Sequence, residues 1–290
     1  MPETPGALMR RLKREVANPD DRVEGEQVTK FFWLPAETMA LAHSAPTGTG
    51  RGPVYYAMPT WSVTNLLSWW TLAEIEAARD IHDGYNGTVN GNPVYTQGVD
   101  LDIDRVRRFL RFDGTGDDVD VGDITELDGA ATVTWACRFR VSSLATLRAL
   151  IGRSVAVNEQ FSIEVDTSGR VYAFLNGGIR GYTVAGTIAL NTWYTLVVVF
   201  NGAGATNPDK QQIYVNGVPK TLTFASAPPA TLATVTGDVY IGQRGDGSQR
   251  LVGDEYDTAI WLTNLSAAQA LAYHNDASTD RIVAGFFKAS

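Results

Sequence analysis

The sequence predicts an all-β protein in which two antiparallel sheets pack face to face as a sandwich. Residues 132–141 alternate strictly between apolar and polar side chains, which indicates a strand in a half-buried antiparallel sheet. Residues 193–200 are an uncharged run of aromatic and β-branched residues, which suits a strand buried on both faces or nearly so. Short strands at regular spacing, followed by one short helix near the C-terminus, are typical of a two-sheet sandwich.

Residues 1–62 are predicted to form a mostly irregular N-terminal arm, distinct from the domain formed by residues 63–290. Residues 8–16 fit two turns of basic helix, which Pro19 would end. Apolar patches then alternate with Pro and Gly, a composition that cannot cover its own aromatic rings yet is too apolar for an ordinary disordered tail. The arm therefore either folds back on its own domain or docks on a neighbouring subunit, and we predict docking. The residues expected to anchor it are Phe31, Phe32, Trp33, Leu34, Tyr55 and Tyr56.

The β domain is expected to begin near Val63, with residues 66–70 as its first strand. A following strand carries a stripe of basic side chains, which is expected to be solvated or to pair with an acidic subunit surface. These side chains are Arg105, Arg107, Arg108 and Arg111. In the alternating strand at residues 132–141, Cys137 lies on the apolar face, so we expect it to be a small core residue.

Turn residues predict how the later strands are joined. Residues 161–165 and 170–174 are predicted to pair as a hairpin, because the turn at residues 166–169 ends in glycine. Residues 177–186 are expected to form a polar crossing segment. The strand at residues 213–215 ends in Asn216-Gly217, a pair that accepts positive φ at both central positions of a hairpin turn.

The last elements are two strands and a helix. Residues 239–242 and 253–261 read as strands on either side of a glycine-rich loop. Ser266 and Gln269 have the spacing of a capping box, which predicts a short helix that runs to about His274.

Three motifs together resemble the laminin-G-like, concanavalin A-like lectin-glucanase domain. They are the strand that starts at Trp193 and is followed by I-Y-V-N-G-V at residues 213–218, L-R-F-D-G-T-G-D-D-V at residues 110–119 and G-D-E-Y-D-T-A-I-W at residues 253–261. The resemblance extends from about residue 63 to the C-terminus and leaves residues 1–60 outside it. It implies a concanavalin A-like jelly roll of two antiparallel sheets.

The resemblance also implies a possible calcium site. Domains of this kind often bind calcium near an edge of the sandwich, through an early aspartate, backbone carbonyls and a late aspartate, which suits a hard cation. Asp80 and Asp254 match those two positions. The alternative is that the two carboxylates cap turns or pair with Arg residues without a metal.

Glycoside hydrolases occur among proteins of this fold, so paired carboxylates are candidate catalytic groups. Glu255 and Asp257, like Glu164 and Asp166, are two residues apart, which would place each pair on one face of a strand. The hydrolases that this domain resembles continue the pattern to a second glutamate that acts as the general acid, and neither pair has one. Without an acid to protonate the leaving group, we predict no catalytic residues and no enzyme activity.

Carbohydrate binding requires exposed aromatic rings together with polar side chains in loops. Residues of this type in or near predicted loops are candidates for binding sugar, although tyrosines in a sandwich are more often core or edge residues. The candidates are Tyr85, Asn86, Tyr172, Arg180 and Tyr182.

Composition excludes several classes of partner. The chain carries a net charge of −8, and residues 61–290 hold all of this excess, which argues against nucleic acid as the main ligand. No apolar run approaches the ~18 residues of a membrane span, so no membrane partner is expected. The single cysteine excludes a disulfide within the chain and a cysteine zinc site. The N-terminus lacks the apolar stretch of a signal peptide, which fits a protein released by lysis.

These observations predict a non-enzymatic structural protein of a bacteriophage virion, assembled in the host cytoplasm. The arm would bind other virion subunits within a homo-oligomeric assembly, and the jelly roll would project outward and bind host surface glycans. Arg outnumbers Lys 19 to 5, which fits a GC-rich genome. The sequence does not separate a minor tail or fibre protein from a capsid decoration protein; fold-level analogy favours the tail. The alternatives are a cellular carbohydrate-binding module or adhesin and a glycoside hydrolase.

Overall fold

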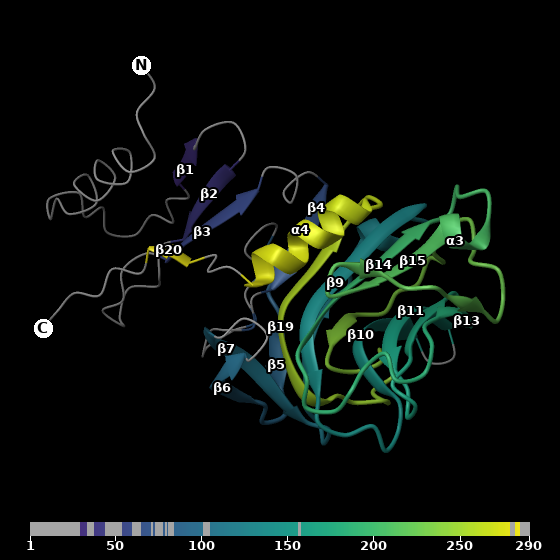
Figure 1. The fold of residues 1–290 in the computed structure, drawn as a ribbon, viewed down its shortest axis with the longest axis horizontal. Helices are drawn as coiled ribbons and strands as arrows, with labels where there is room; N and C mark the ends of the chain where they lie inside the picture. Colours follow the sequence, from purple (N-terminus) through teal and green to yellow (C-terminus); the bar gives the residue numbers. More distant parts are fainter. Residues whose placement is uncertain are drawn as a thin grey trace, which may run out of the picture.

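The computed structural model describes a β-sandwich with a C-terminal helix and a smaller sheet beside it (Figure 1). The described residues are 30–33, 38–43, 54–59, 65–70, 72, 78, 80, 84–100, 105–155, 158–278 and 282–284. Both sheets of the sandwich are antiparallel and eight-stranded, so the predicted two-sheet fold is confirmed.

We call one of these sheets the front sheet. Its strands, in order across it, are β17 (Thr223–Phe224), β13 (Gly178–Tyr182), β12 (Val171–Leu175), β11 (Asn158–Val165), β10 (Arg148–Val155), β18 (Val239–Ile241), β8 (Asp118–Gly122) and β5 (Thr88–Asn90). The predicted hairpin at residues 161–174 is β11 paired with β12. The segment expected to be a polar crossing contains the strand β13, which pairs with β12.

The other sheet is the back sheet. Its strands are β16 (Val218–Pro219), β15 (Gln211–Val215), β14 (Tyr194–Asn201), β9 (Thr132–Val141), β19 (Val252–Trp261), β7 (Arg105–Asp113) and β6 (Val94–Asp100), with β4 (Leu66–Trp70) paired to β19. Two short helical segments lie in the connections, η1 (Thr125–Leu127) and α3 (Asn207–Lys210).

The core lies between the two sheets and consists of large apolar side chains. Its members from β9 are Val133, Trp135, Cys137, Phe139 and Val141, the set that the alternation predicts. Trp135 contacts Phe161 of the front sheet, with 4.8 Å between the ring centroids. Burial of each such side chain contributes about 1.5–3 kcal/mol, so these contacts hold the two sheets together.

The opposite face of β9 is also buried, which its polar residues did not predict. Ala136 and Arg138 on this face are almost inaccessible to solvent. A second apolar cluster covers this side of the back sheet, and its aromatic members Trp69, Trp261 and Tyr273 have centroids 5.8–6.0 Å apart. Tyr273 belongs to the C-terminal helix, so the helix acts as a third layer.

This helix, α4 (Ala267–Ser278), begins with the predicted capping box. The Ser266 amide donates to Gln269 Oε1 at 2.8 Å, and the Gln269 amide donates to Ser266 Oγ at 3.3 Å. The helix ends at Ser278, beyond the predicted end at His274. No helix in the described part of the chain combines the length and the hydropathy that a membrane crossing requires.

The turn at Asn216-Gly217 has the predicted backbone conformation. Both residues have positive φ, 53° and 71°, and they join β15 to β16. A Cβ atom on Gly217 would lie 2.8 Å from Cδ1 of Leu271, so the turn also brings the backbone against α4. Glycine is therefore required here for conformation and for close packing.

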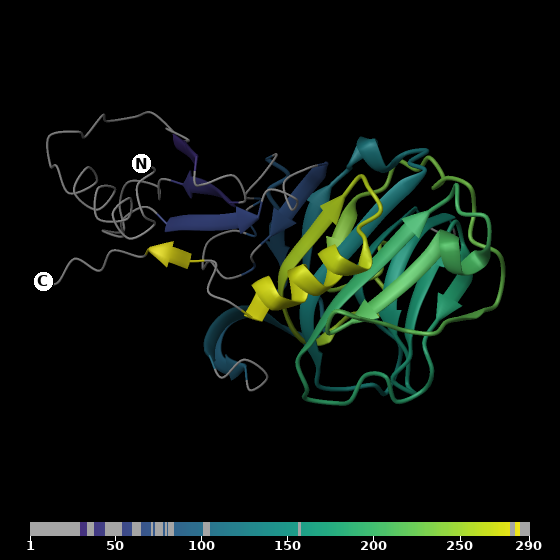
Figure 2. The same cartoon turned by 45° about the horizontal axis from the view of Figure 1, so that its top comes forward.

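The N-terminal region contains more strand than the sequence predicts. β1 (Lys30–Trp33), β2 (Thr38–His43), β3 (Val54–Pro59) and β20 (Ile282–Ala284) form a four-stranded antiparallel sheet (Figure 2). The apolar patches interpreted as parts of an irregular arm lie on these strands, because aromatic and β-branched runs between Pro- and Gly-rich segments favour strands and turns.

The anchoring residues have known strand positions in this small sheet. Phe31, Phe32 and Trp33 lie on β1, and Tyr55 and Tyr56 lie on β3. Leu34 and the predicted basic helix at residues 8–16 lie outside the described residues.

The pairing of β20 brings residues near the C-terminus to the N-terminal strands. Residues 282–284, which the boundary at residue 63 assigned to the jelly roll, pair with β3 of the N-terminal region. The last strand of the sandwich is β19, and α4 follows it. The chain therefore returns to its own N-terminal region after completing the sandwich.

Candidate functional site

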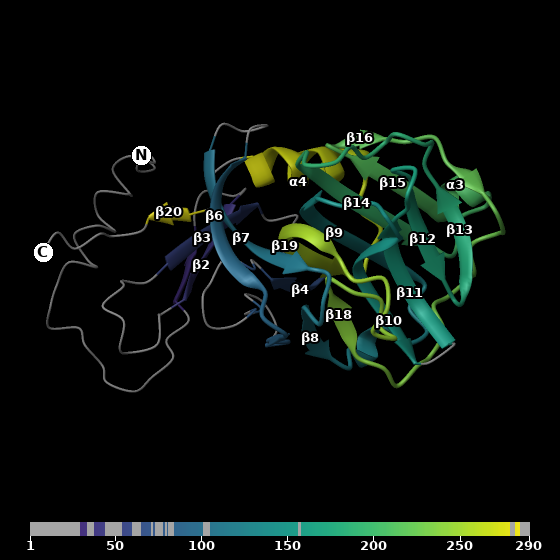
Figure 3. The same ribbon diagram turned by 90° about the horizontal axis from the view of Figure 1, so that it is seen from below.

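The outer face of the front sheet carries a row of aromatic side chains. On β12, Val171 and Ala173 point into the core, so Tyr172 and Phe174 point outward. The register places Tyr172 opposite Tyr182 of β13, and Glu164 of β11 opposite Tyr172 on its other side. Figure 3 shows the three strands lying next to one another.

We call Tyr182, Tyr172 and Phe174 the aromatic row. The Tyr182 and Tyr172 rings stack with centroids 4.9 Å apart and an interplanar angle of 16°. Tyr172 and Phe174 stack with centroids 6.1 Å apart and an interplanar angle of 26°. All three side chains are half-buried, so each is partly accessible from the outer face of the sheet. The two tyrosines add a hydroxyl group each.

A guanidinium group lies at each end of the aromatic row. Arg170 lies over the Tyr182 ring, 5.7 Å from its centroid, and donates to the Tyr172 hydroxyl at 3.1 Å. Arg244 lies over the Phe174 ring, 5.1 Å from its centroid. Cation–π contacts of this kind fix the orientation of both partners, so the row is a preformed surface of rings, hydroxyls and N–H donors.

A buried carboxylate holds Arg244 in place. Glu164 is fully buried, and its Oε1 accepts hydrogen bonds from Arg244 Nε at 2.7 Å and from Ser162 Oγ at 2.7 Å. The loop that carries Arg244 lies directly on β10, where a Cβ atom on Gly152 would be 3.2 Å from the Arg244 Cα. Sequence reasoning missed Arg244, and the glycine-rich loop around it was the only signal for its position.

Arg180 lies in the same hairpin but its side chain makes other contacts. Its guanidinium donates to the carbonyl oxygens of Leu175 and Asn176 at 2.8 and 3.3 Å and to Ser226 Oγ at 2.7 Å. Burial lowers the pKa of Arg180. These bonds close the turn between β12 and β13, so Arg180 supports the hairpin that carries the aromatic row.

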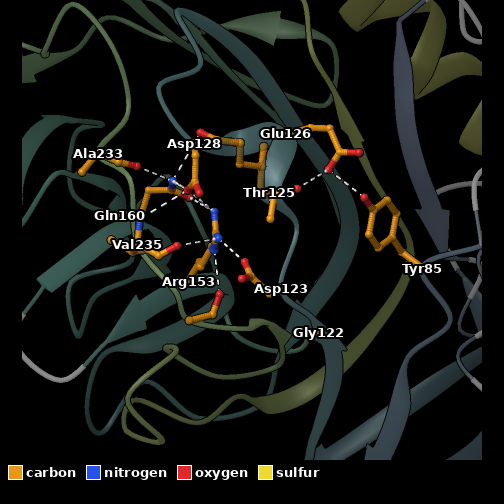
Figure 4. Close-up of polar contacts among 12 residues, drawn as sticks. Tyr85, Gly122, Asp123, Thr125, Glu126, Asp128, Arg153, Gln160, Ala233 and Val235 are labelled. Carbon is orange, nitrogen blue, oxygen red and sulfur yellow. Dashed lines mark hydrogen bonds and ion pairs between the residues drawn. The ribbon is translucent and has the colours of Figure 1, made fainter.

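Tyr85 and Asn86 lie apart from this row. They precede β5, the edge strand of the front sheet that is farthest from β17 and β13. The Tyr85 hydroxyl donates to Glu126 at 2.7 Å (Figure 4), and Asn86 Oδ1 accepts from the amide of Asp80 at 3.1 Å. The structure therefore brings Tyr172, Tyr182 and Arg180 together and separates Tyr85 and Asn86 from them.

Asp80 and Asp254 do not fit a shared calcium site. Asp80 accepts hydrogen bonds on both carboxylate oxygens, from the Trp69 amide at 2.9 Å and from Ser68 Oγ at 2.9 Å. Asp254 is buried between Arg111 and Arg140 and forms an ion pair with each. The described residues contain no group of three or more His, Cys, Asp or Glu side chains that could hold a metal ion. The chemistry of both sites is that of structural hydrogen bonding and charge pairing.

The two carboxylate pairs considered for hydrolysis are also separated. Asp257 has φ 54° and lies in a β-bulge, which breaks the alternation that would place it on one face with Glu255. The expectation of a shared face is wrong for this pair, because the bulge inserts residues without partners in β9. Asp166 lies in the turn after β11, where its Oδ1 accepts from the amides of Ser168 and Arg170, both at 2.8 Å.

Glu255 is inside the sandwich. Its side chain is fully buried, and its Oε1 accepts a hydrogen bond from Thr258 at 2.7 Å. Burial raises the pKa of Glu255 from its ordinary value of 4.5 to about 8. Burial, followed by the nearby Glu255, raises the pKa of Cys137 well above its ordinary value. Neither group is accessible to a ligand on the outer face.

Comparisons with known proteins agree with this architecture. Residues 113–270 match the model of a family described as the concanavalin A-like lectin/glucanases superfamily. Among solved structures, the Trypanosoma rangeli sialidase in complex with sialic acid matches with a TM-score of 0.54 and 12% identity, covering 87% of this chain and 45% of that chain. The receptor-binding domain of botulinum neurotoxin C/D mosaic serotype matches with a TM-score of 0.53 and 13% identity, covering 73% of this chain and 51% of that chain.

These matches have clear limits. At 12–13% identity, the likeness to the two solved structures shows the fold alone. The chain spans about half the length of those structures. No curated protein sequence matches it.

Proposed function

The chain belongs to the concanavalin A-like lectin/glucanases superfamily, and from this premise we propose that it binds carbohydrate on the outer face of its front sheet. The observation that carries the proposal is the aromatic row with a guanidinium group at each end. Sugar sites combine apolar aromatic surface with a few precisely placed polar groups. The described surface of this sheet supplies both within one hairpin and the loop beside it.

The row offers two kinds of contact to a sugar. The C–H groups of a pyranose ring would make van der Waals contact with the accessible apolar parts of Tyr172 and Tyr182, which are rigid side chains. Its hydroxyl groups would bond to the two tyrosine hydroxyls and to Arg170, whose side chain is 35% exposed. Because the rings stack on one another before any ligand arrives, little ordering is required on binding.

We propose that this binding is not accompanied by hydrolysis. Glu164 is fully buried beneath Arg244, and Glu255 lies between the sheets. Asp166 is committed to the turn after β11. A hydrolase of this class needs two carboxyl groups on either side of an exposed glycosidic bond, and these carboxylates do not supply that arrangement.

Replacing Tyr172 with Ala is expected to weaken glycan binding by roughly tenfold or more, because the central ring of the row is lost and an aromatic contact is worth about 1–2 kcal/mol. The measurement is a glycan array followed by titration calorimetry on the best ligand. The matched control is Tyr85→Ala at the opposite edge of the sheet, which should bind normally. Loss of binding with Tyr85→Ala and not with Tyr172→Ala would move the site, and an array without any glycan bound by the native protein would contradict the proposal.

We further propose that this domain is a structural component of a bacteriophage virion, either a minor tail or fibre protein or a capsid decoration protein. The N-terminal strands β1 and β3 have the sequences KFFW and VYYAMP, which are unusually apolar for a separate small sheet. A sheet of this composition favours docking on a neighbouring subunit. The glycan-binding face favours the tail over the capsid, because a tail contacts the host surface.

Deleting residues 1–62 is expected to abolish self-association and incorporation into particles, because the strands that carry the anchoring residues are removed. The measurement is light scattering coupled to size-exclusion chromatography, with circular dichroism to check that the sandwich remains folded. Truncated protein that associates like the full chain would contradict the anchoring proposal. A full chain that binds glycan as a monomer would favour the alternative of a cellular carbohydrate-binding module.

A further inference from the structure

A shallow groove lies at the rim of the sandwich, beside the hairpin that carries the aromatic row. It has a volume of about 510 Å³, within the range of about 300–1,000 Å³ that small-molecule sites occupy. Its walls come from the connection between β9 and β10, the turn between β11 and β12 and the segment after β13. The lining residues are Ser142, Ser143, Leu144, Ala145, Thr167, Ser168, Gly169, Ile188 and Leu190.

The chemistry of the lining selects a neutral ligand rich in hydroxyl groups. None of the nine lining residues is ionisable, so the groove offers no charge to pair with an ion. Ser142, Thr167 and Ser168 are exposed residues, and their side chains bring hydroxyl groups to this lining. Leu190 is 48% exposed and supplies apolar surface next to them. A sugar ring has this combination of hydroxyl groups and apolar C–H faces.

The walls of the groove are held in place by backbone hydrogen bonds. The Gly186 amide donates to the Ser168 carbonyl at 2.8 Å, and the Ile188 amide donates to the Gly169 carbonyl at 2.9 Å. A Cβ atom on Gly169 would lie 2.3 Å from the Ile188 carbonyl oxygen, so only glycine permits this approach. The groove is therefore formed before a ligand arrives.

The groove and the aromatic row share two segments of the chain. Thr167 and Ser168 line the groove, and Arg170 at the end of the same turn lies over Tyr182 in the row. In the segment that runs from the end of β13, Tyr182 belongs to the row and Ile188 lines the groove. The turn at residues 166–169 therefore separates the groove from the end of the row at Tyr182.

We propose that the groove is a second sugar subsite, which takes a neutral unit of the same glycan whose neighbouring units lie on the aromatic row. The proposal rests on the proposed carbohydrate-binding function and specifies its ligand. The protein recognises a chain of several sugar units that includes a neutral one, and a single sugar occupies only part of the site.

The test uses the full chain and four series of neutral oligosaccharides, the malto-, cello-, xylo- and N-acetylated chito-oligosaccharides of one to six units, with titration calorimetry. For the native protein, affinity is expected to rise about tenfold or more between the short and the long members of the series that binds. Ala145→Arg fills the groove and should remove this rise without changing the affinity for short members. The matched control is Thr146→Arg, because Thr146 is equally exposed but does not line the groove.

The possible results separate this inference from the proposed function. Binding that is lost with Tyr172→Ala but is independent of chain length in the native protein would overturn the subsite and leave the proposed function standing. Equal effects of Ala145→Arg and Thr146→Arg would also overturn the subsite. If no series binds, the proposed function fails, and the subsite fails with it. Leu190→Asn, at an exposed position, provides a second groove variant and is expected to reduce the rise with length if Ala145→Arg does not fold.

Discussion

Replacing Glu255 with Gln is expected to stabilise the sandwich at pH 8 by up to about 4–5 kcal/mol and to make its stability nearly independent of pH between 5 and 8. The cause is the burial of this carboxyl group between the sheets, where desolvation raises its pKa to about 8. Hydrogen bonds from Thr258 and from the Cys137 thiol favour the charged form, but they offset only part of the effect of burial. A buried carboxylate with so little compensation strongly favours its neutral form.

The direction in which stability changes with pH follows from the number of protons that the folded and unfolded states bind. In the unfolded chain Glu255 loses its proton near the ordinary pKa of about 4.3, whereas in the folded chain it keeps the proton until the pH reaches about 8. Between these values the folded state holds one more proton, so the free energy of unfolding falls by up to about 1.4 kcal/mol per pH unit as the pH rises. The stability contributed by the neutral group is therefore complete below about pH 4 and lost by about pH 8.

The measurement is urea unfolding of both proteins at pH 5, 6, 7 and 8. At pH 5 the folded Glu255 is neutral and the unfolded chain is already mostly ionised there, so linkage contributes only about 1 kcal/mol to the effect of Glu255→Gln, beside its effect on packing and on the bond from Thr258. The matched control is Glu126→Gln, which makes the same substitution at an exposed position and should keep the pH dependence of the native protein, because Glu255 is still present. Parallel stability curves for the native protein and Glu255→Gln across this range would refute a raised pKa.

Much of the sandwich could be predicted from the sequence because its strands carry local signals. The predicted first strand at residues 66–70 has the same bounds as β4. In the two predicted turns, Asn216, Gly217 and Gly169 have positive φ. Cys137 is a buried core residue, as its place in the alternating strand predicts. Each of these features depends on residues close together in the chain, so a short window contains the information.

The features that could not be predicted depend on contacts between distant residues. The sequence near Glu255 does not reveal the bulge at Asp257, because the bulge is defined by the register against β9. The outer face of β9 is buried only because α4 covers it, more than a hundred residues later. Only part of the aromatic row could be predicted: Tyr172 and Tyr182 are among the sequence candidates, whereas Phe174 and Arg244 are not, because Arg244 reaches Phe174 from a distant loop.

Replacing Arg153 with Met is expected to destabilise the sandwich by roughly 2–4 kcal/mol, because a fully buried guanidinium is removed from several acceptors while its two carboxylate partners are partly exposed. Arg153 is fully buried, and Figure 4 shows its guanidinium surrounded by acceptors from three separate segments. Those acceptors are the carboxylates of Asp123 and Asp128, Oε1 of Gln160 and the carbonyl oxygens of Val235 and Gly237.

The network matters because it closes one end of the sandwich. Residues 123–128 and 233–237 are connecting segments without extended strands, and Arg153 joins both to β10. Gln160 of β11 reinforces the same contacts, since its Nε2 donates to the Leu127 carbonyl at 3.3 Å and to Asp128 Oδ1 at 3.1 Å. With Met at position 153, Asp128 would keep only part of its hydrogen bonding, and the carbonyl oxygens would lose a donor in a place that water reaches poorly.

The measurement for Arg153→Met is urea unfolding at pH 7. The control is Arg170→Met, which makes the same substitution at a partly exposed guanidinium. The exposed control should lose much less stability than Arg153→Met, because surface ion pairs contribute little. Arg153→Lys is expected to lie between the two, since an ammonium keeps the charge but cannot reach five acceptors in the fixed directions of a guanidinium. Similar losses for Arg153→Met and Arg170→Met would mean that the connecting segments are held by their apolar contacts and not by this network.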